Sequence, residues 1–222
     1  MSSIESTELK VSCLGSSAVL CESLGPLDIT CQARFWALAQ VVSRWPEVAE
    51  VVPGMNNLMV VLTQGEAEPL GVVEKVRREW PHVAPAHAKG KVVEVPVVYG
   101  GDGGPDLEFV ASHTGIDVET VIKLHTQPDY TVYFLGAHPG FGYLGGLDSK
   151  LHTPRLDKPR LSVPAGSVAI GGVQTGVIAL TSPSGWRLIG HAEQDFFDPY
   201  REPPALLTPG DTVRFQCIRA ER

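Results

Sequence analysis

The protein has 222 residues, of which 43% are hydrophobic and 19% are charged, and its formal net charge is −7 at pH 7. This length suits one large domain or two small ones, and the composition is that of a globular protein able to bury a core. A negative net charge without a concentrated basic face argues against nucleic-acid binding. No apolar run approaches the length of a membrane span, which argues against a membrane-embedded protein.

Cysteine and histidine usage gives no indication of metal chemistry or of secretion. The four cysteines show no Cys-x-x-Cys spacing, and the seven histidines show no spacing typical of metal ligands, so no metal site is predicted. Residues 1–10 are polar and lack the apolar centre of a secretory signal. We therefore expect reduced, mostly buried thiols in a cytoplasmic protein.

Residues 1–90 are predicted to form a small α+β domain. Hydrophobic periodicity and turn residues predict strands at 9–14, 18–23, 48–52 and 58–63, a helix opened by Pro26 and Asp28 and ended by Pro46, and a helix over 70–80. The order strand, helix, strand, strand, helix, followed by an apolar run at 92–98, is typical of a split βαβ sandwich. We place the end of this domain in a linker over 81–90 that contains two prolines.

Residues 91–222 are predicted to form a second domain. A glycine-rich joint at 99–105 leads into two short helices, expected at 106–113 and 118–125. Strands are expected before, within and after the long glycine-rich region that follows, at 130–135, 177–180 and 212–218. The glycine-rich region is interpreted as loops carried by a sheet, which is where binding chemistry is usually built.

Residues 136–146, Gly-Ala-His-Pro-Gly-Phe-Gly-Tyr-Leu-Gly-Gly, contain the spacing Gly-x-Gly-x-x-Gly. A dinucleotide site needs a helix directly after this loop, and the prolines within 148–159 exclude one, so we reject a Rossmann site. Successive glycine amides, including those of Gly140 and Gly142, could form a nest for a carboxylate or phosphate. A tight turn without a ligand is an equally good interpretation.

Two arginines follow this loop, each directly after a proline: Arg155 and Arg160. Proline restricts the backbone, so both guanidinium groups would be presented at a small ordering cost. A guanidinium matches a carboxylate or phosphate at two points. The alternative is a pair of solvated arginines or surface ion pairs.

Other polar residues lie beside the glycines. His138 precedes Pro139 and is therefore expected to be extended, where it could act as a general acid or base or donate to an oxyanion. Gln174 and Thr175 offer amide and hydroxyl groups to a polar ligand. The alternatives are a hydrogen-bonded loop histidine and ordinary turn chemistry.

Several blocks, taken together and in order, resemble the family of the B subunit of 5-oxoprolinase, also called allophanate hydrolase subunit 1 or KipI-like proteins. They are VPVVYGG, GPDLEFVASHTGIDVETVIKLH, YTVYFLG, GAHPGFGYLGGLD, TPR…KPR, VPAGSVAIGGVQTG, SPSGWRLIG and FDPYREPPALLTPGDTVRF. The resemblance covers about residues 92–218 closely and the N-terminal domain in layout only.

The resemblance implies a ferredoxin-like N-terminal domain followed by a cyclophilin-like β-barrel. It also implies partners, subunits A and C, with which such proteins couple ATP hydrolysis to opening the lactam ring of 5-oxoproline, giving glutamate; ATP is then a co-substrate and the chain alone is inactive. Together with the residue analysis, this predicts catalytic roles for His138, Arg155 and Arg160. Substrate-binding roles are predicted for Gly140, Gly142, Tyr143, Gln174, Thr175 and His191.

The sequence departs from the family pattern at several positions. Ala137-His138 stands where the family has phenylalanine-alanine, Gly142 stands where it has proline, and residues 177–180 differ from the family's usual sequence. His191 stands where the family has arginine, so it would bind an anion only when protonated.

Other functions stay open at this stage. Some relatives inhibit a sensor histidine kinase, and urea carboxylase contains similar carboxyltransferase-type domains that meet biotin. Prolyl isomerase activity would rest on the barrel's shape alone.

Overall fold

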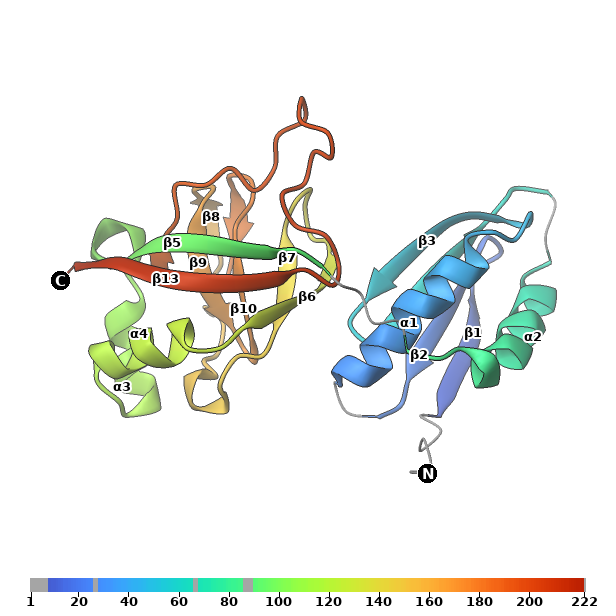
Figure 1. Ribbon diagram of the computed structural model, residues 1–222, viewed down its shortest axis with the longest axis horizontal. Coiled ribbons are helices and arrows are strands. Elements are labelled where there is room, and N and C mark those ends of the chain that lie inside the picture. The colour runs from blue at the N-terminus through green and yellow to red at the C-terminus, as the bar shows by residue number, and fades with distance from the viewer. Residues whose placement is uncertain (1–7, 26–27, 66–67, 86–89, 222) are drawn as a thin grey trace. The chain divides into compact units, whose positions relative to one another are not determined.

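The computed structural model describes residues 8–25, 28–65, 68–85 and 90–221 (Figure 1). The chain divides into two compact units, Met1–Ala88 and Lys89–Arg222, which we describe separately. Pro26, predicted to open a helix, and residues 86–89 of the predicted linker lie outside the described residues. None of the helices in the described ranges is long and apolar enough to cross a membrane.

The first unit contains the helices and strands that the periodicity predicts. They are β1 (Leu9–Leu14), β2 (Ala18–Ser23), α1 (Ile29–Val42), β3 (Val48–Gly54), β4 (Asn57–Leu62) and α2 (Pro69–Glu79), followed by the 3-10 turn η1 (Trp80–His82). Asp28 caps α1, because its carboxylate accepts a hydrogen bond from the Cys31 amide at 3.1 Å. The second hairpin is tighter than predicted, since β3 and β4 extend to leave Met55 and Asn56 as its turn.

The sheet of this unit has the order β1-β2-β4-β3, and each neighbouring pair is antiparallel. β2 and β3 are therefore parallel to each other, with β4 between them and α1 as their connection, which is a split βαβ unit. The outer strand beside β2 is β1, and the apolar run after residue 91 belongs to the second unit. Buried residues of both helices pack with the sheet, among them Phe35, Leu38, Val72, Val76, Leu58 and Val60.

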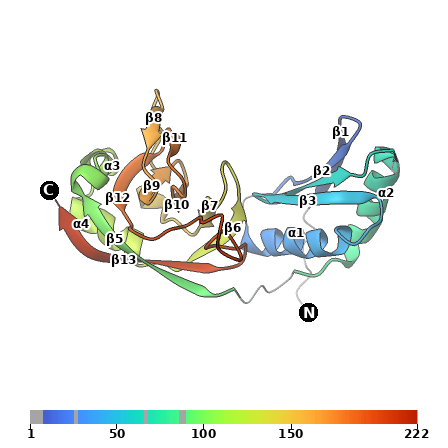
Figure 2. The same cartoon turned by 90° about the horizontal axis from the view of Figure 1, so that it is seen from above.

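The second unit begins with β5 (Val92–Gly100), the turn η2 (Gly101–Gly103) and the predicted helical pair, α3 (Leu107–Thr114) and α4 (Val118–Thr126). The remaining elements are β6 (Tyr130–Leu135), β7 (Gly142–Gly145), η3 (Ser149–Leu151), β8 (Arg160–Val163), β9 (Ser167–Gly171), β10 (Gln174–Val177), β11 (Ser182–Ser184), β12 (Arg187–His191) and β13 (Thr212–Glu221). Strands close into a barrel in the order β10-β7-β6-β13-β5-β12-β9. β8 and β11 pair separately, as a ribbon that projects from the barrel (Figure 2).

The glycine-rich region was expected to be loops, and much of it is barrel strand instead. The glycines lie where an aromatic ring packs directly on the backbone. A Cβ on Gly145 would lie 2.4 Å from the Tyr133 ring, and one on Gly171 would lie 2.5 Å from the Trp186 indole. Such contacts explain why glycine occurs within strands here. The same glycines, counted in the sequence alone, led to the expectation of loops.

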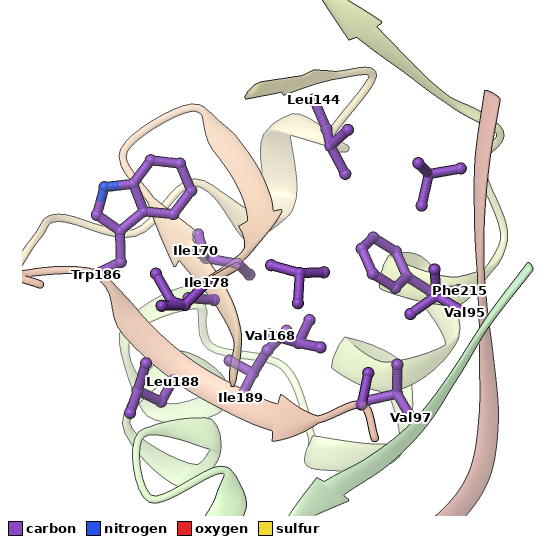
Figure 3. Close-up of a cluster of buried hydrophobic side chains, with 14 of the residues drawn as sticks. Val95, Val97, Leu144, Val168, Ile170, Ile178, Trp186, Leu188, Ile189 and Phe215 are labelled. Carbon is purple, nitrogen blue, oxygen red and sulfur yellow. The ribbon is translucent and has the colours of Figure 1, made fainter. Parts of the chain in front are cut away.

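The barrel interior is the core of the second unit. Apolar side chains from its strands point toward one another in Figure 3, among them Val95, Val97, Val168, Ile170, Ile189 and Phe215, all of which are buried. α3 packs against β12 and α4 against β13. The molecule is therefore α+β, with a closed barrel and a separate sheet. The last strand has a bulge between Cys217 and Arg219. The Cys217 side chain is exposed, which is an exception to the expectation of mostly buried thiols.

A chain of hydrogen bonds runs through this core. The Thr175 hydroxyl donates to the Ala169 carbonyl (3.0 Å), so it accepts from Nε2–H of His125 (2.8 Å). Nδ1 of His125 then accepts from the Tyr99 hydroxyl at 2.7 Å. Burial without a charged partner lowers the pKa of His125 from 6.5 to about 3. This histidine is therefore neutral and structural.

The buried His125 makes the stability of the barrel unit depend on pH. Below pH 6.5 the unfolded state binds a proton on this histidine and the folded state does not. The free energy of unfolding therefore falls by ~1.4 kcal/mol per pH unit. Urea unfolding of the full chain should show a loss of ~2 kcal/mol from this group between pH 7 and pH 5. In His125→Gln, which cannot titrate, this pH-dependent loss should disappear. An equal loss in both proteins would contradict the assignment.

Candidate functional site

Four aromatic side chains form a continuous cluster on one side of the barrel. The aromatic cluster consists of Phe134, Phe141, Tyr143 and Trp186. Tyr143 stacks on Phe134 with ring centroids 4.3 Å apart, and lies edge-on to Phe141 at 4.8 Å. Phe141 in turn lies edge-on to Trp186 at 5.4 Å. The pairing of β6 with β7 places Phe134 opposite Tyr143, so strand register builds the cluster.

Trp186 is the member of the aromatic cluster that packs directly on the barrel strands. Its indole lies against the backbone of Gly171, and a Cβ on Gly176 would be 3.5 Å from its ring. Trp186 is buried, and Figure 3 shows it beside the barrel's apolar side chains. Two glycines on neighbouring strands thus create the flat surface that a large ring needs.

Arg155 lies over this tryptophan, with its guanidinium carbon 5.5 Å from the ring centroid. The residue is exposed, and no carboxylate in the described parts of the chain comes within ion-pair distance of it. It belongs to a segment that we call the strap, residues 153–159. The strap is held at its start and at its middle: Thr153 bridges to Gly172, and the Leu156 amide donates to the Gly185 carbonyl at 2.7 Å. The anchored strap therefore presents a cation that has no ion-pair partner among the described residues.

His138 lies at the opposite edge of the aromatic cluster. Its ring centroid is 5.1 Å from that of Phe141, and its Nδ1 atom is buried with no hydrogen-bond partner among the described residues. It borders an open depression of about 420 Å³ formed by residues 135–140 and Phe197. Ala137, immediately before it, has a φ of 62°, which is unusual for a residue with a Cβ. A strained loop therefore holds a histidine that has unused hydrogen-bonding capacity.

Gln174 faces the same side of the barrel as the aromatic cluster, to which Tyr143 belongs. Thr175 is paired with Leu144, and both point into the barrel, so their sequence neighbours point out of it. Nε2 of Gln174 is buried and has no partner among the residues described. The structure thus brings His138, Tyr143, Arg155 and Gln174 to one face, where a ligand could meet a cation, an imidazole and an amide.

Thr175 is not part of this face. It is fully buried, and its hydroxyl already makes the hydrogen bonds to His125 and Ala169 described above. The prediction that it binds substrate does not fit this geometry, because strand alternation turns it into the core. Sequence adjacency to Gln174 gave no warning of this difference.

Gly140 and Gly142 are explained by packing. Gly140 has a φ of +77°, and a Cβ there would lie 2.7 Å from Cβ of Phe197. A Cβ on Gly142 would lie 2.9 Å from the Leu207 side chain inside the barrel. Both residues are buried. They shape the loop that carries His138, and a direct role in binding stays a prediction.

Arg160 is engaged elsewhere, contrary to the expectation that it faces the substrate. Both of its terminal nitrogens donate to the carboxylate of Asp106, at 2.9 and 3.1 Å. This bidentate pair occupies the guanidinium fork that a ligand would need. The two proline-flanked arginines therefore diverge, Arg155 toward Trp186 and Arg160 toward Asp106, and we assign Arg160 a structural role.

Asp106 is the residue that sequence analysis missed. It is buried, it immediately precedes α3, and its carboxylate also accepts a hydrogen bond from the Leu188 amide at 2.7 Å. Arg187 lies 3.9 Å from the same carboxylate and donates through Nε to the Pro154 carbonyl at 3.2 Å. Asp106 therefore connects α3, β12 and β8 to the strap that carries Arg155. An aspartate before a helix usually signals only a cap, so the pattern gave no hint of this role.

His191 lies away from the aromatic cluster. β9 pairs with β12 so that His191 is opposite Ser167, at the other end of the strand from Trp186 and its neighbour Arg187, which is opposite Ile170. His191 borders a separate groove. Within the described ranges, no group of three or more histidine, cysteine, aspartate or glutamate side chains is placed to hold a metal ion.

The Asp106 carboxylate should matter strongly for stability. In Asp106→Asn, Arg160 and the largely buried Arg187 lose their counter-charge, so the free energy of unfolding of the barrel unit should fall by ~3 kcal/mol. Urea unfolding measures the loss. Asp129→Asn is the matched control, because Asp129 pairs with Arg214 at the surface, where both side chains are about half exposed. Equal effects of the two substitutions would contradict a special role for Asp106.

Comparison with known proteins places the chain in a family. The carboxyltransferase domain, subdomain C and D, family matches residues 9–207. The chain is 49% identical to the 5-oxoprolinase B subunit of Escherichia coli O157:H7 over 202 residues, which cover 91% of this chain and 93% of that protein.

Solved structures share the fold. TTHA0988 matches with a TM-score of 0.76 at 35% identity; the match covers 92% of this chain and 40% of TTHA0988, so this chain spans two fifths of that longer protein. The urea amidolyase of K. lactis matches with a TM-score of 0.84 at 19% identity, over 96% of this chain and 15% of the amidolyase, and shows a common fold. The chain belongs to the 5-oxoprolinase B-subunit family of carboxyltransferase-domain proteins.

Proposed function

We propose that this chain is the B subunit of an ATP-dependent 5-oxoprolinase, which opens the lactam of 5-oxoproline to glutamate together with subunits A and C. The observation that carries the proposal is the position of Arg155, a cation without an ion-pair partner in the described parts of the chain, over Trp186 on the face that also carries His138 and Gln174. The identity to the Escherichia coli protein supports the choice of reaction.

The chemistry explains why ATP is needed as a co-substrate. An unstrained lactam carbonyl is a poor electrophile, and transfer of the terminal phosphoryl group to its oxygen makes the carbon attackable by water. The carbon–nitrogen bond of this adduct then breaks, the nitrogen takes up a proton, and an acyl phosphate is left. A second water hydrolyses the acyl phosphate, which releases phosphate and gives glutamate. Arg155 is suited to hold the substrate carboxylate or a phosphoryl oxygen, and the imidazole of His138, at the edge of the open depression, is suited to exchange a proton.

The proposed site is incomplete in this chain. The depression beside His138 is open, and Arg155 stands on an exposed strap. Catalysis on a phosphorylated intermediate requires water to be controlled, which an open surface does not do. We infer that the partner subunits supply the remaining groups and close the site, so the chain alone is inactive. A cytoplasmic location is part of the same proposal.

The finer fold assignments also belong here. We interpret residues 1–90 as a ferredoxin-like domain in which β1 takes the outer position of the sheet, and residues 91–222 as a cyclophilin-like barrel with a leading helical pair. The likeness to urea amidolyase supports an allophanate hydrolase or urea carboxylase-type carboxyltransferase module only as a related architecture, because the identity is 19%. A role as a KipI-like kinase inhibitor has no specific observation in its favour.

Arg155 provides the first test of this proposal. In the complex reconstituted with subunits A and C, Arg155→Ala should lower 5-oxoproline-dependent ATP hydrolysis by roughly 10²-fold, because it removes a cation that stabilises developing charge. Lys158→Ala, which removes an exposed cation from the same strap, is the control and should leave the rate unchanged. Full activity of Arg155→Ala would remove this residue from the site.

A substitution of His138 provides a second test of the proposal. If its imidazole transfers a proton, His138→Ala in the reconstituted complex should lower kcat by roughly 10²-fold while the unfolding curve stays the same. The measurement is steady-state ATP hydrolysis with 5-oxoproline varied, so that kcat and KM are separated. Unchanged kinetics would assign His138 to loop structure alone.

A further inference from the structure

A second concave site lies on the outside of the barrel, apart from the aromatic cluster. It is a groove of about 500 Å³, within the range of small-molecule sites, and we call it the lateral groove. Its lining residues come from β5, β12, β13 and the segment after β12; they are Pro96, Val98, His191, Glu193, Gln194, Ile218 and Arg219. Nothing in the proposed oxoprolinase site uses this groove.

Strand register aligns the floor of the lateral groove. Val98 of β5 is paired with His191 on one side and with Arg219 on the other. A basic side chain therefore flanks an apolar floor on each side, across three neighbouring strands. The backbones of β12 and β13 are about 10 Å apart at this row, because adjacent strands are spaced by roughly 4.8 Å. Both side chains are long enough to reach one small ligand between them.

A bulge in β13 brings further groups to the groove. The pairing with β5 shifts between Cys217 and Arg219, which leaves Ile218 outside the ladder and 63% exposed. Bulges turn side chains in new directions and occur often beside functional sites. Here the bulge adds an aliphatic side chain to the wall formed by Pro96 and Val98. An exposed isoleucine in this position gains contacts only if something fills the groove.

The segment after β12 supplies hydrogen-bond acceptors. Glu193 contributes a carboxylate to the lining, and Oε1 of Gln194 is buried without a hydrogen-bond partner among the described residues. A buried acceptor without a donor is costly, and a ligand that brings an N–H group would satisfy it. The groove thus has donors at His191 and Arg219, and acceptors at Glu193 and Gln194.

The position of His191 depends on two glycines. A Cβ on Gly166 would lie 2.7 Å from Cε1 of His191, and one on Gly103 would lie 2.9 Å from its Cβ. Only residues without a side chain leave room for the imidazole at this place. The ring is therefore seated against the backbone at the edge of the groove, which reduces the entropy lost when a ligand binds.

We propose that the lateral groove binds a small zwitterion of the amino-acid type with an aliphatic side chain. The ligand's carboxylate accepts hydrogen bonds from Arg219 and His191, its ammonium group donates to Glu193 and to Oε1 of Gln194, and its side chain packs on Val98 and Ile218. Opposite charges at the two polar edges select for a molecule that carries both signs. Arg219 also pairs with Glu221 at 2.7 Å, but this pair is exposed and a ligand carboxylate can replace it.

The test measures binding to the full chain alone, without ATP or partner subunits, so it is independent of the proposed function. Isothermal titration with L-leucine should show binding to one site per chain. N-acetyl-L-leucine, which lacks the ammonium group, and 3-methylbutylamine, which lacks the carboxylate, should each bind at least about tenfold more weakly. Absence of L-leucine binding up to about 10 mM, or equal affinity for all three compounds, would overturn the proposal.

Variants locate the binding. Arg219→Gln and Glu193→Gln should each weaken L-leucine binding at least about tenfold. Arg214→Gln, which removes an arginine from the same strand outside the groove, is the matched control and should bind as the unmodified chain does. Retained affinity in both groove variants would place the ligand elsewhere and contradict the proposal. Circular dichroism confirms that each variant is folded, and the ligand series on the unmodified chain needs no variant.

Discussion

One buried carboxylate, that of Asp106, connects the elements around the candidate site of the barrel unit. It accepts a bidentate hydrogen-bonded pair from Arg160 and a backbone hydrogen bond from Leu188, and it lies near Arg187, which supports the strap. Removing a carboxylate from water is costly, so this arrangement persists only because nearly all of its acceptor capacity is used. Arg155 keeps its place over Trp186 because the strap is anchored there. The position of Arg155, the cation proposed to act on substrate, thus depends on the Asp106 carboxylate, with which it makes no contact.

Strand alternation divides the polar residues of the glycine-rich region into structural and accessible groups. Thr175 points inward and joins the hydrogen bonds of His125, whereas Gln174, its neighbour, points outward with an unpartnered amide. Glycines at the same strands remove the side chains that would otherwise keep Trp186 off the barrel. The candidate face is therefore a consequence of how the barrel fills its interior. The lateral groove arises in the same way, from a strand bulge and from glycines that seat His191.

The sequence predicted the helices and the first-unit strands well, because apolar periodicity and capping residues such as Asp28 are local signals. The strands of the barrel that contain glycine were missed, because the reason for each glycine is a ring from a distant strand, as with Gly171 and Trp186. At the candidate site, the grouping of His138, Tyr143, Gln174 and Arg155 was anticipated as one region. The pairing of Arg160 with Asp106 was not anticipated, because the two residues lie 54 positions apart and only the fold brings them together.

The central claim is that Asp106 serves the reaction by positioning Arg155. A double-mutant cycle measures this directly, with 5-oxoproline-dependent ATP hydrolysis of the reconstituted complex as the readout under conditions where every variant is folded. If the claim is right, Asp106→Asn lowers the rate in the unmodified background and causes no further loss once Arg155 is alanine. Losses that multiply, so that the double variant is slower than Arg155→Ala by the full factor of Asp106→Asn, would contradict it.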